Sequence, residues 1–446
     1  MLRRATVAPD ARFVIARPAL RAWGAAVAKI ETLSLADALA IAAAMALPWS
    51  TSVTSILIAV WLIACLPTLD LARLRQECTT PTGGLSCLLW ALCALGVLWA
   101  DAPWADRLVA LGKFHKLLLI PVLIAQFRSS RNGWKVVAGL LLSCTVLLVL
   151  SLASARWPEV AWWRPNNPGV PFRNQDSQSV EFTVCMFGLC CLAIDAWRQK
   201  RLQWAFSSAA LAMAFLADIL YVATSRAQLM VVAMLTVFLG LKKFGWKGGS
   251  LGLITVLLVA FSAWSTSPYL RNRIDHAVWE LDRYEANNGA TSIGLRLEWW
   301  RKSIGFIADA PLLGHGTGSI RSLFQAAATG TEGASANVTA NPHNQILAVG
   351  IQLGFTGMAV LLAMWTAHFW LFRGSELAAW IGSVLVIQSM IGGLFTASLN
   401  DFTEGWLYVF GVGVLGGIVS NPALRASSAN RSSQEARCAG QASSDA

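Results

Sequence analysis

The chain has 446 residues, 56% of them hydrophobic and only 13% charged, whereas charged residues make up about 25% of an ordinary soluble domain. The formal net charge is +11, but the basic residues are dispersed between apolar runs and form no stripe with interleaved aromatics, so we exclude a nucleic-acid-binding protein. The composition instead predicts an all-α polytopic membrane protein, since the apolar runs approach the roughly 20 residues that a transmembrane helix needs.

The predicted elements begin with a cytoplasmic segment, residues 1–32. It is rich in arginine and has no compact apolar core with a cleavage site behind it, so we expect no cleavable signal peptide. Transmembrane helices 1–9 are predicted within residues 33–265 and helices 10–12 within residues 345–420. The twelve spans are expected at 33–49, 51–67, 84–100, 107–127, 136–154, 179–196, 203–222, 227–241, 250–265, 345–371, 377–396 and 405–420.

The distribution of basic residues predicts the orientation of these spans. Cytoplasmic segments of membrane proteins carry an excess of Lys and Arg. With the N-terminus inside, every inside segment holds basic residues, Arg73, Lys135, Lys243 and Arg373 among them. Both termini are therefore predicted to lie inside, and residues 421–446, rich in Ser, Ala and Arg, are predicted to form a disordered cytoplasmic tail.

Two predicted outside segments, 155–178 and 266–344, are too long to be simple turns, and long ordered loops often carry function. In the second we expect a helix near 271–286 and another near 293–308, with apolar residues at helical spacing. Its stretch 312–340, rich in Gly, Ala, Ser and Thr, predicts a loop. The nine cysteines include no CxxC pair and none lies in an outside loop, so neither a zinc site nor a disulfide framework is predicted.

Arg226 stands at an outside helix junction, in Thr224-Ser225-Arg226, directly before an apolar run. A cation in the first turn of a helix opposes the helix dipole, and it also stands on the side where basic residues are rare. Both costs vanish if an anion binds there, because a helix N-terminus and an arginine together suit a phosphate group. The alternative is an arginine that snorkels or pairs with Asp218.

His343 ends the long outside loop, directly before the tenth span. Imidazole is the side chain best suited to proton transfer near neutral pH. The alternative is a histidine that caps or packs the start of a helix, and local sequence alone leaves both readings open.

Several short motifs occur in order along the chain: Ser225-Arg226 at a helix start, Gly-Leu-Arg-Leu-Glu-Trp-Trp at 294–300, and Pro342-His343-Asn344-Gln345 after the long outside loop. Together with about twelve spans they resemble the O-antigen ligase superfamily, which includes O-antigen polymerases and protein O-oligosaccharyltransferases. The resemblance covers residues 33–420. It implies a GT-C-like membrane glycosyltransferase with a large periplasmic loop, a periplasmic active site, and a place in the bacterial inner membrane.

The resemblance also implies roles for single residues. His343 would be the catalytic base, and Arg226 and Arg296 would bind the diphosphate of the donor, although Arg301 lies close to Arg296 in the sequence. Arg173 is a further candidate for substrate binding. The donor would be O-antigen linked to undecaprenyl diphosphate, the acceptor lipid A-core, and the remaining partners membrane lipids. No metal and no cofactor are expected.

Two alternatives to a ligase remain. A polymerase or a protein O-oligosaccharyltransferase of the same superfamily would use the same kind of donor. A lipid-linked glycan transporter belongs to a different class and is expected to have polar residues and broken helices at the membrane midplane. Only Asp37, Lys113 and Asp218 hint at such residues.

Overall fold

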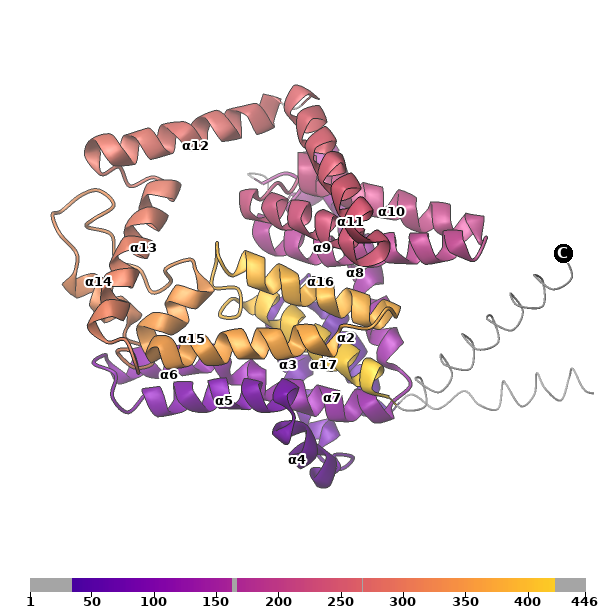
Figure 1. The fold of residues 1–446 in the computed structure, drawn as a ribbon, viewed down its shortest axis with the longest axis horizontal. Helices are drawn as coiled ribbons and strands as arrows, with labels where there is room; N and C mark the ends of the chain where they lie inside the picture. Colours follow the sequence, from indigo (N-terminus) through magenta and orange to yellow (C-terminus); the bar gives the residue numbers. More distant parts are fainter. Residues whose placement is uncertain (1–33, 163–166, 267, 422–446) are drawn as a thin grey trace, which may run out of the picture.

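A computed structural model describes residues 34–162, 167–266 and 268–421. Within these ranges every regular element is an α-helix or a short 3-10 helix (Figure 1). The predicted segment 1–32 and nearly all of the predicted tail 421–446 lie outside the described residues. The all-α polytopic class predicted from the sequence is confirmed.

Each of the twelve predicted spans contains a helical segment. These are α2 (Leu35–Ala46), α3 (Thr51–Cys65), α5 (Pro81–Gly96), α6 (Trp104–Phe114) with η1 (His115–Leu118) and α7 (Leu119–Ser129), α8 (Gly133–Arg156), α9 (Gln175–Arg198), α10 (Leu202–Tyr221), α11 (Arg226–Thr266), α15 (Gln345–Leu371), α16 (Leu377–Gly392) and α17 (Phe402–Ser420). By length and hydropathy, seven helices of the described ranges could cross a membrane, or eight if α4 (Leu71–Thr79) and α5 form one bent span. Both counts are lower than twelve because α2, α3 and α16 are apolar but short, and because α11, which covers two predicted spans, is counted as one helix.

Helix α11 is a 41-residue run that contains two helices. They meet at Gly245, whose φ of +64° is outside the helical range and suits glycine. A Cβ added to Gly240 would lie 2.0 Å from the carbonyl oxygen of Gly248, so the two arms run side by side. The run therefore holds both predicted spans, 227–241 and 250–265, as a close hairpin.

The segment between α11 and α15 carries three helices on the left of the view in Figure 1, on the side of the molecule away from α10. They are α12 (Pro268–Asn287), α13 (Ser292–Asp309) and α14 (Ile320–Ala326). The first two match the predicted helices near 271–286 and 293–308. The third corrects the prediction of a loop throughout 312–340, because Ile320 and Phe324, one turn apart, are buried in a small apolar core with α13 and α15.

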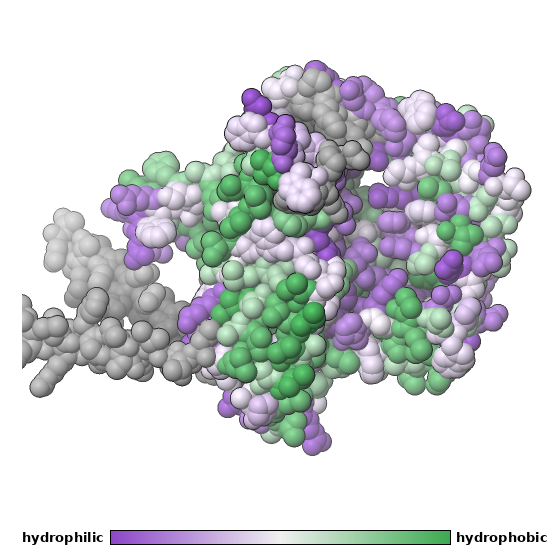
Figure 2. All heavy atoms as spheres, turned by 180° about the vertical axis from the view of Figure 1, so that it is seen from behind, coloured by the Kyte–Doolittle hydropathy of each residue, from purple (hydrophilic) through white to green (hydrophobic). Residues whose placement is uncertain are grey.

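The surface follows the same division. Figure 2 shows hydrophobic residues gathered over the middle of the body, whereas hydrophilic residues concentrate toward the end that carries α12, α13 and α14. Large apolar side chains such as Leu257, Phe261 and Val149 are exposed on α11 and α8. Exposed apolar area on this scale is typical of a surface that faces lipid.

Candidate active site

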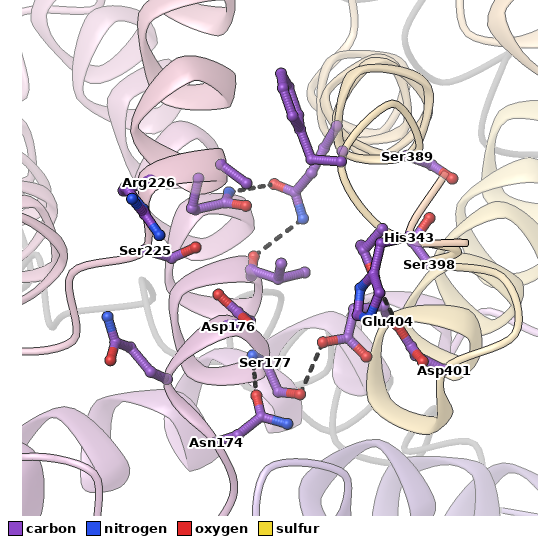
Figure 3. A pocket seen from close by; sticks show the side chains of 18 of the residues that line it. Asn174, Asp176, Ser177, Ser225, Arg226, His343, Ser389, Ser398, Asp401 and Glu404 are labelled. Carbon is purple, nitrogen blue, oxygen red and sulfur yellow. Dashed lines mark hydrogen bonds between the residues drawn. The ribbon is translucent and has the colours of Figure 1, made fainter. Parts of the chain in front are cut away.

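A cavity of about 610 Å³ lies where α9, α11, α13, α16 and α17 meet the loop before α15. All four residues that the sequence singled out line this cavity: Arg173, Arg226, Arg296 and His343. They come from four separate parts of the chain, and the fold brings them together. Figure 3 shows Arg226 on one side of the cavity and His343 on the other.

Arg226 is the first residue of α11, and its guanidinium pairs with Glu280 of α12 at 3.8 Å. The buried Glu280 carboxylate also accepts a hydrogen bond from the backbone N–H of Ile293 at 2.9 Å and meets Nδ1 of His276 at 2.9 Å. One carboxylate thus ties α12 to the first turns of α11 and α13. The alternative pairing of Arg226 with Asp218 is wrong, because the guanidinium of Arg226 contacts Glu280 instead.

The site of Asp218 is structural. Its carboxylate accepts hydrogen bonds from Ser151 of α8 and, at 3.2 Å, from Gln178 of α9. These contacts join three helices inside the body.

Arg296 is half-buried on α13 and takes part in no hydrogen bond or ion pair within the described ranges. Burial lowers the pKa of its guanidinium; the charge of nearby Asp176 opposes this shift and that of Arg226 adds to it. Two guanidinium groups therefore face the same space, one of them without a partner. Such a pair suits an anion with more than one charge.

Arg301, the sequence alternative to Arg296, contacts Glu298 and not the cavity. Its Nε and Nη2 donate to the carboxylate of Glu298 at 3.0 and 2.7 Å, and its side chain is 71% exposed. It does not line the cavity. The hydrogen bonds from Arg301 are also the main reason why the pKa of Glu298 is lowered.

Arg173, in the bend before α9, contacts the first turn of α17. It donates a hydrogen bond to the hydroxyl of Thr403, and its guanidinium carbon lies 5.5 Å from the ring centroid of Phe402. Arg173 therefore lines the cavity near the carboxylates of Asp401 and Glu404.

His343 is fixed by its backbone and by α13. Its φ of +52° is left-handed, a conformation in which histidine is enriched among non-glycine residues. Its backbone N–H donates to Oδ1 of Asn341 at 2.9 Å, and its ring stacks on Trp299 with centroids 5.3 Å apart. Trp300 donates from Nε1 to the carbonyl of Pro342 at 3.0 Å. The two tryptophans of α13 thus hold the imidazole at the cavity wall.

The residues that follow His343 have structural roles. Asn344 caps α15 by accepting from the backbone of Leu347 at 3.1 Å. Gln345 is fully buried and accepts from the backbone N–H of Leu399 at 2.9 Å. The motif around His343 therefore also anchors the loop between α16 and α17.

The electrostatic surroundings favour a neutral imidazole. Burial lowers the pKa of His343 below its usual value, and the positive charge of Arg296 lowers it further. The carboxylates of Asp401 and Asp176 oppose these effects. A neutral imidazole at pH 7 can accept a proton, as a general base must.

Sequence reasoning missed the carboxylates of the cavity: Asp176, Glu280, Asp401 and Glu404. Asp401 precedes α17 and accepts from the hydroxyl of Thr396 at 3.1 Å. Burial raises its pKa, and the charges of Lys116 and His343 oppose this shift. The available signal was the run Asn-Asp-Phe-Thr-Glu at 400–404, which places two acids at the outside end of a span.

Two further contacts fix these acids. Glu404 accepts a hydrogen bond from Ser177 of α9 at 2.7 Å. The buried Lys116, at the helix break η1, donates to the backbone carbonyl of Asp401 at 2.6 Å. In Figure 3, Asp401 and Glu404 lie beside His343 and away from Arg226.

Charge in the cavity is thus nearly balanced and unevenly placed. Three arginines and four carboxylates line it. Arg226 lies at one wall, whereas His343, Asp401 and Glu404 form another. Arg296 lies near enough to both for charge effects, since the charge of Arg226 lowers the pKa of Arg296 and that of Arg296 lowers the pKa of His343. The arrangement can bind a multiply charged anion at one wall and deprotonate a neutral group at the other.

No group of three or more His, Cys, Asp or Glu side chains within the described ranges is arranged to hold a metal ion. The eight cysteines of these ranges are free thiols.

Comparison with known protein families gives one match. Residues 211–362 match the family described as O-antigen ligase. The matched range contains Arg226, Arg296 and His343, whereas Arg173 and Asp401 lie outside it. No curated protein matches the sequence.

Proposed function

We propose that this chain, a member of the O-antigen ligase superfamily through residues 211–362, is the ligase of lipopolysaccharide biosynthesis. It would move O-antigen polysaccharide from undecaprenyl diphosphate to a sugar hydroxyl of lipid A-core. It would do so in the bacterial inner membrane, with its cavity facing the periplasm. The donor must arrive activated there, since that compartment holds no ATP.

A single observation carries the proposal. Two arginines, Arg226 of α11 and Arg296 of α13, and a histidine in the loop before α15 whose pKa is lowered by burial line one cavity. This pairing suits transfer from a diphosphate, because the leaving group needs charge neutralisation while the attacking hydroxyl needs a base.

The reaction follows from these positions. The acceptor hydroxyl attacks the anomeric carbon of the donor sugar, and His343 takes the proton of that hydroxyl. The bond between the anomeric carbon and the diphosphate oxygen breaks, and the electron pair leaves with the diphosphate. Arg226 and Arg296 stabilise the charge that develops on this leaving group. Direct displacement inverts the configuration at the anomeric carbon.

We expect the reaction to be independent of metal, because the guanidinium groups provide the positive charge that a divalent ion otherwise supplies. The test is transfer by purified protein from lipid-linked donor to rough lipopolysaccharide in the presence of EDTA. Full activity is expected. Loss of activity with EDTA and recovery with a divalent cation would contradict this part of the proposal.

A deletion strain distinguishes the ligase from its relatives. Its surface polysaccharide, run on a gel, should show core without any O-antigen. Core that bears a single repeat unit would identify a polymerase instead. Core without O-antigen together with lipid-linked glycan that accumulates on the cytoplasmic side would identify a transporter. Unchanged lipopolysaccharide would point to protein O-oligosaccharyltransfer.

A further inference from the structure

A second polar cavity, of about 490 Å³, lies between the start of α2, the turn from α3 to α4 and the end of α7. We call it the distal cavity. Its charged lining consists of two carboxylates, Asp37 and Asp70, and two guanidinium groups, Arg73 and Arg131. Most of the remaining lining residues carry a hydroxyl or an amide. The volume falls in the range of small-molecule sites, about 300–1,000 Å³.

The distal cavity lies at the far end of α17 from His343. Asp401, which precedes α17, lines the first cavity. Asn421, which follows α17, has its side-chain amide 3.4 Å from the backbone carbonyl oxygen of Ser130, a residue of the distal cavity. With 19 residues, α17 is about 28 Å long at the usual helical rise, close to the roughly 30 Å of a bilayer's hydrocarbon core. The two cavities therefore belong to opposite surfaces of the membrane.

Asp37 is the buried charge of the distal cavity, with an exposed fraction of 4%. Its carboxylate accepts hydrogen bonds from the amides of Gln126 and Asn132, both at 2.8 Å, and from the hydroxyl of Ser130 at 2.7 Å. All three donors are neutral, and Asp37 forms no ion pair with a residue of the described ranges. A carboxylate has about four acceptor sites, so one remains. Because buried carboxylates are usually paired with a cation, this position suits a cation that can donate a hydrogen bond.

Positive charge lies nearer to solvent in the distal cavity. Arg73 pairs with Asp70 at 3.1 Å and donates a hydrogen bond to the hydroxyl of Ser129. Its side chain is 55% exposed, and Arg131 is exposed as well. The formal charges of the lining cancel, so the cavity suits a zwitterion. The best match carries a cation at its tip, which reaches Asp37, and an anion behind the tip, which meets the guanidinium groups.

The rim of the distal cavity is apolar. Leu35 of α2 and Leu71 of α4 are sequence neighbours of lining residues, and their side chains are 68% and 74% exposed. Leu66, at the end of α3, is exposed in the same way. Exposed leucines beside a charged cavity suit a molecule that has a charged head and apolar tails. The rim therefore favours a lipid over a free zwitterion.

We propose that the distal cavity binds the phosphoethanolamine headgroup of a phospholipid. The ammonium lies at Asp37, the phosphate at Arg73 and Arg131, and the hydrocarbon tails against the exposed leucines. A primary ammonium donates hydrogen bonds, whereas the quaternary ammonium of choline has no N–H. An anionic headgroup such as glycerol phosphate brings no cation to Asp37. The bound lipid joins α2, α4 and α7 at the surface opposite the first cavity.

Native mass spectrometry of the full-length protein in detergent tests the inference. The probes are phosphatidylethanolamine, phosphatidylcholine and phosphatidylglycerol with identical acyl chains, added at equal concentrations. We expect one phosphatidylethanolamine to bind about tenfold more tightly than either of the others, because only its headgroup pairs the buried carboxylate. Glycerophosphoethanolamine, which has the headgroup but no tails, should compete only weakly.

Variants of the lining identify the site. Asp37→Asn removes the buried charge and should abolish the preference for phosphatidylethanolamine over phosphatidylglycerol. Arg73→Gln changes a half-exposed side chain and should weaken phosphatidylethanolamine binding by about threefold, the scale of an exposed ion pair. Arg75→Gln is the matched control and should bind as the unaltered protein does, since Arg75 is exposed on the same helix and does not line the distal cavity.

Each outcome bears on the inference. Equal binding of the three phospholipids would overturn it, because the protein would then hold bulk lipid without selection. A preference that is unchanged in Arg73→Gln, and in Asp37→Asn where that variant folds, would place the lipid elsewhere. Glycerophosphoethanolamine that binds as tightly as the lipid would make the ligand a free zwitterion and overturn the lipid assignment. The inference is independent of the proposed transfer reaction, since the distal cavity shares no lining residue with the first cavity.

Discussion

The imidazole of His343 is held by a stacked ring, a backbone hydrogen bond and a left-handed backbone. Each of these constraints acts before any substrate binds. A base that is fixed in advance loses less entropy when the acceptor hydroxyl arrives. The functional reading of this residue, as opposed to a capping role, stays a prediction, although Asn344 and not His343 caps α15.

Removing the base should lower turnover on the order of 10²–10⁴-fold, the usual size of an acid–base contribution. We expect this loss for both His343→Ala and His343→Asn, measured as transfer from purified lipid-linked donor. Asparagine is the better variant, because it tolerates the left-handed conformation at this position whereas alanine does not. Near-normal turnover by His343→Asn with normal expression would contradict the assignment.

The pH dependence should respond to the charges around His343. Its pKa is lowered by burial and by Arg296, so the neutral base persists at pH 7 and kcat/KM falls only as pH drops through the lowered pKa. Arg296→Gln removes a positive charge that lowers the pKa of His343, so this acid limb should move to higher pH. Asp401→Asn removes a negative charge that raises the pKa of His343, so the acid limb should move to lower pH. Shifts in the same direction would contradict the assignment of the limb to His343.

The arginines can be tested with a matched set of Arg→Lys variants. Lysine keeps the charge but lacks the planar fork, so Arg226→Lys and Arg296→Lys should retain only part of the activity. The alanine variants should lose about 10²–10³-fold, as when a transition-state donor is removed. Arg301→Lys is the control, because Arg301 pairs with Glu298 outside the cavity. Equal losses at all three positions would contradict the assigned roles.

At the scale of the elements, α13 joins the two walls of the cavity. It carries Arg296, the tryptophan that stacks on His343 and the tryptophan that bonds to Pro342. Its first turn is tied to α12 through Glu280. A shift of α13 would therefore move Arg296 and His343, the proposed anion-binding group and base, together.

The sidedness of these elements is testable with single cysteines. We expect Glu332→Cys, an exposed position in the segment between α14 and α15, to react in intact cells with a membrane-impermeant thiol reagent. Lys247→Cys, at the turn of the α11 hairpin, should react only after the cells are opened. The background must lack reactive native cysteines. The reverse pattern would place the cavity in the cytoplasm.

Periodicity and hydropathy were enough to locate a helical segment in each of the twelve predicted spans and two of the three helices between α11 and α15. Helix α14 was missed because Gly, Ala, Ser and Thr dominate 312–340, and a single pair at Ile320 and Phe324 is too weak a signal. The acids Asp401 and Glu404 were missed for another reason. Acids in the first turn of a helix are expected from the helix dipole alone, so nothing in the sequence marked them as part of a site.

On the scale of the whole molecule, the site depends on contacts between distant parts of the chain. Arg173, in the bend before α9, and Glu404 of α17 reach the cavity from positions more than 200 residues apart in the sequence. Local sequence predicted roles for His343 and Arg226, but only the packed bundle shows that both line one cavity. It also excludes Arg301, which sequence alone could not separate from Arg296.

The near balance of charge in the cavity has a thermodynamic consequence. A diphosphate brings further negative charge into a space already lined by four carboxylates, which favours uptake of protons on binding. Asp401, whose pKa burial already raises, is the first candidate to take one up. By linkage, a ligand that prefers the protonated form binds more tightly as pH falls. Donor affinity of the His343→Asn variant should therefore increase as pH falls, whereas turnover of the unaltered protein decreases. The affinity can be measured by calorimetry in buffers of different ionisation enthalpy. If the affinity does not depend on pH and the heat of binding does not depend on the buffer, the donor binds without proton uptake and the arginines alone neutralise its charge.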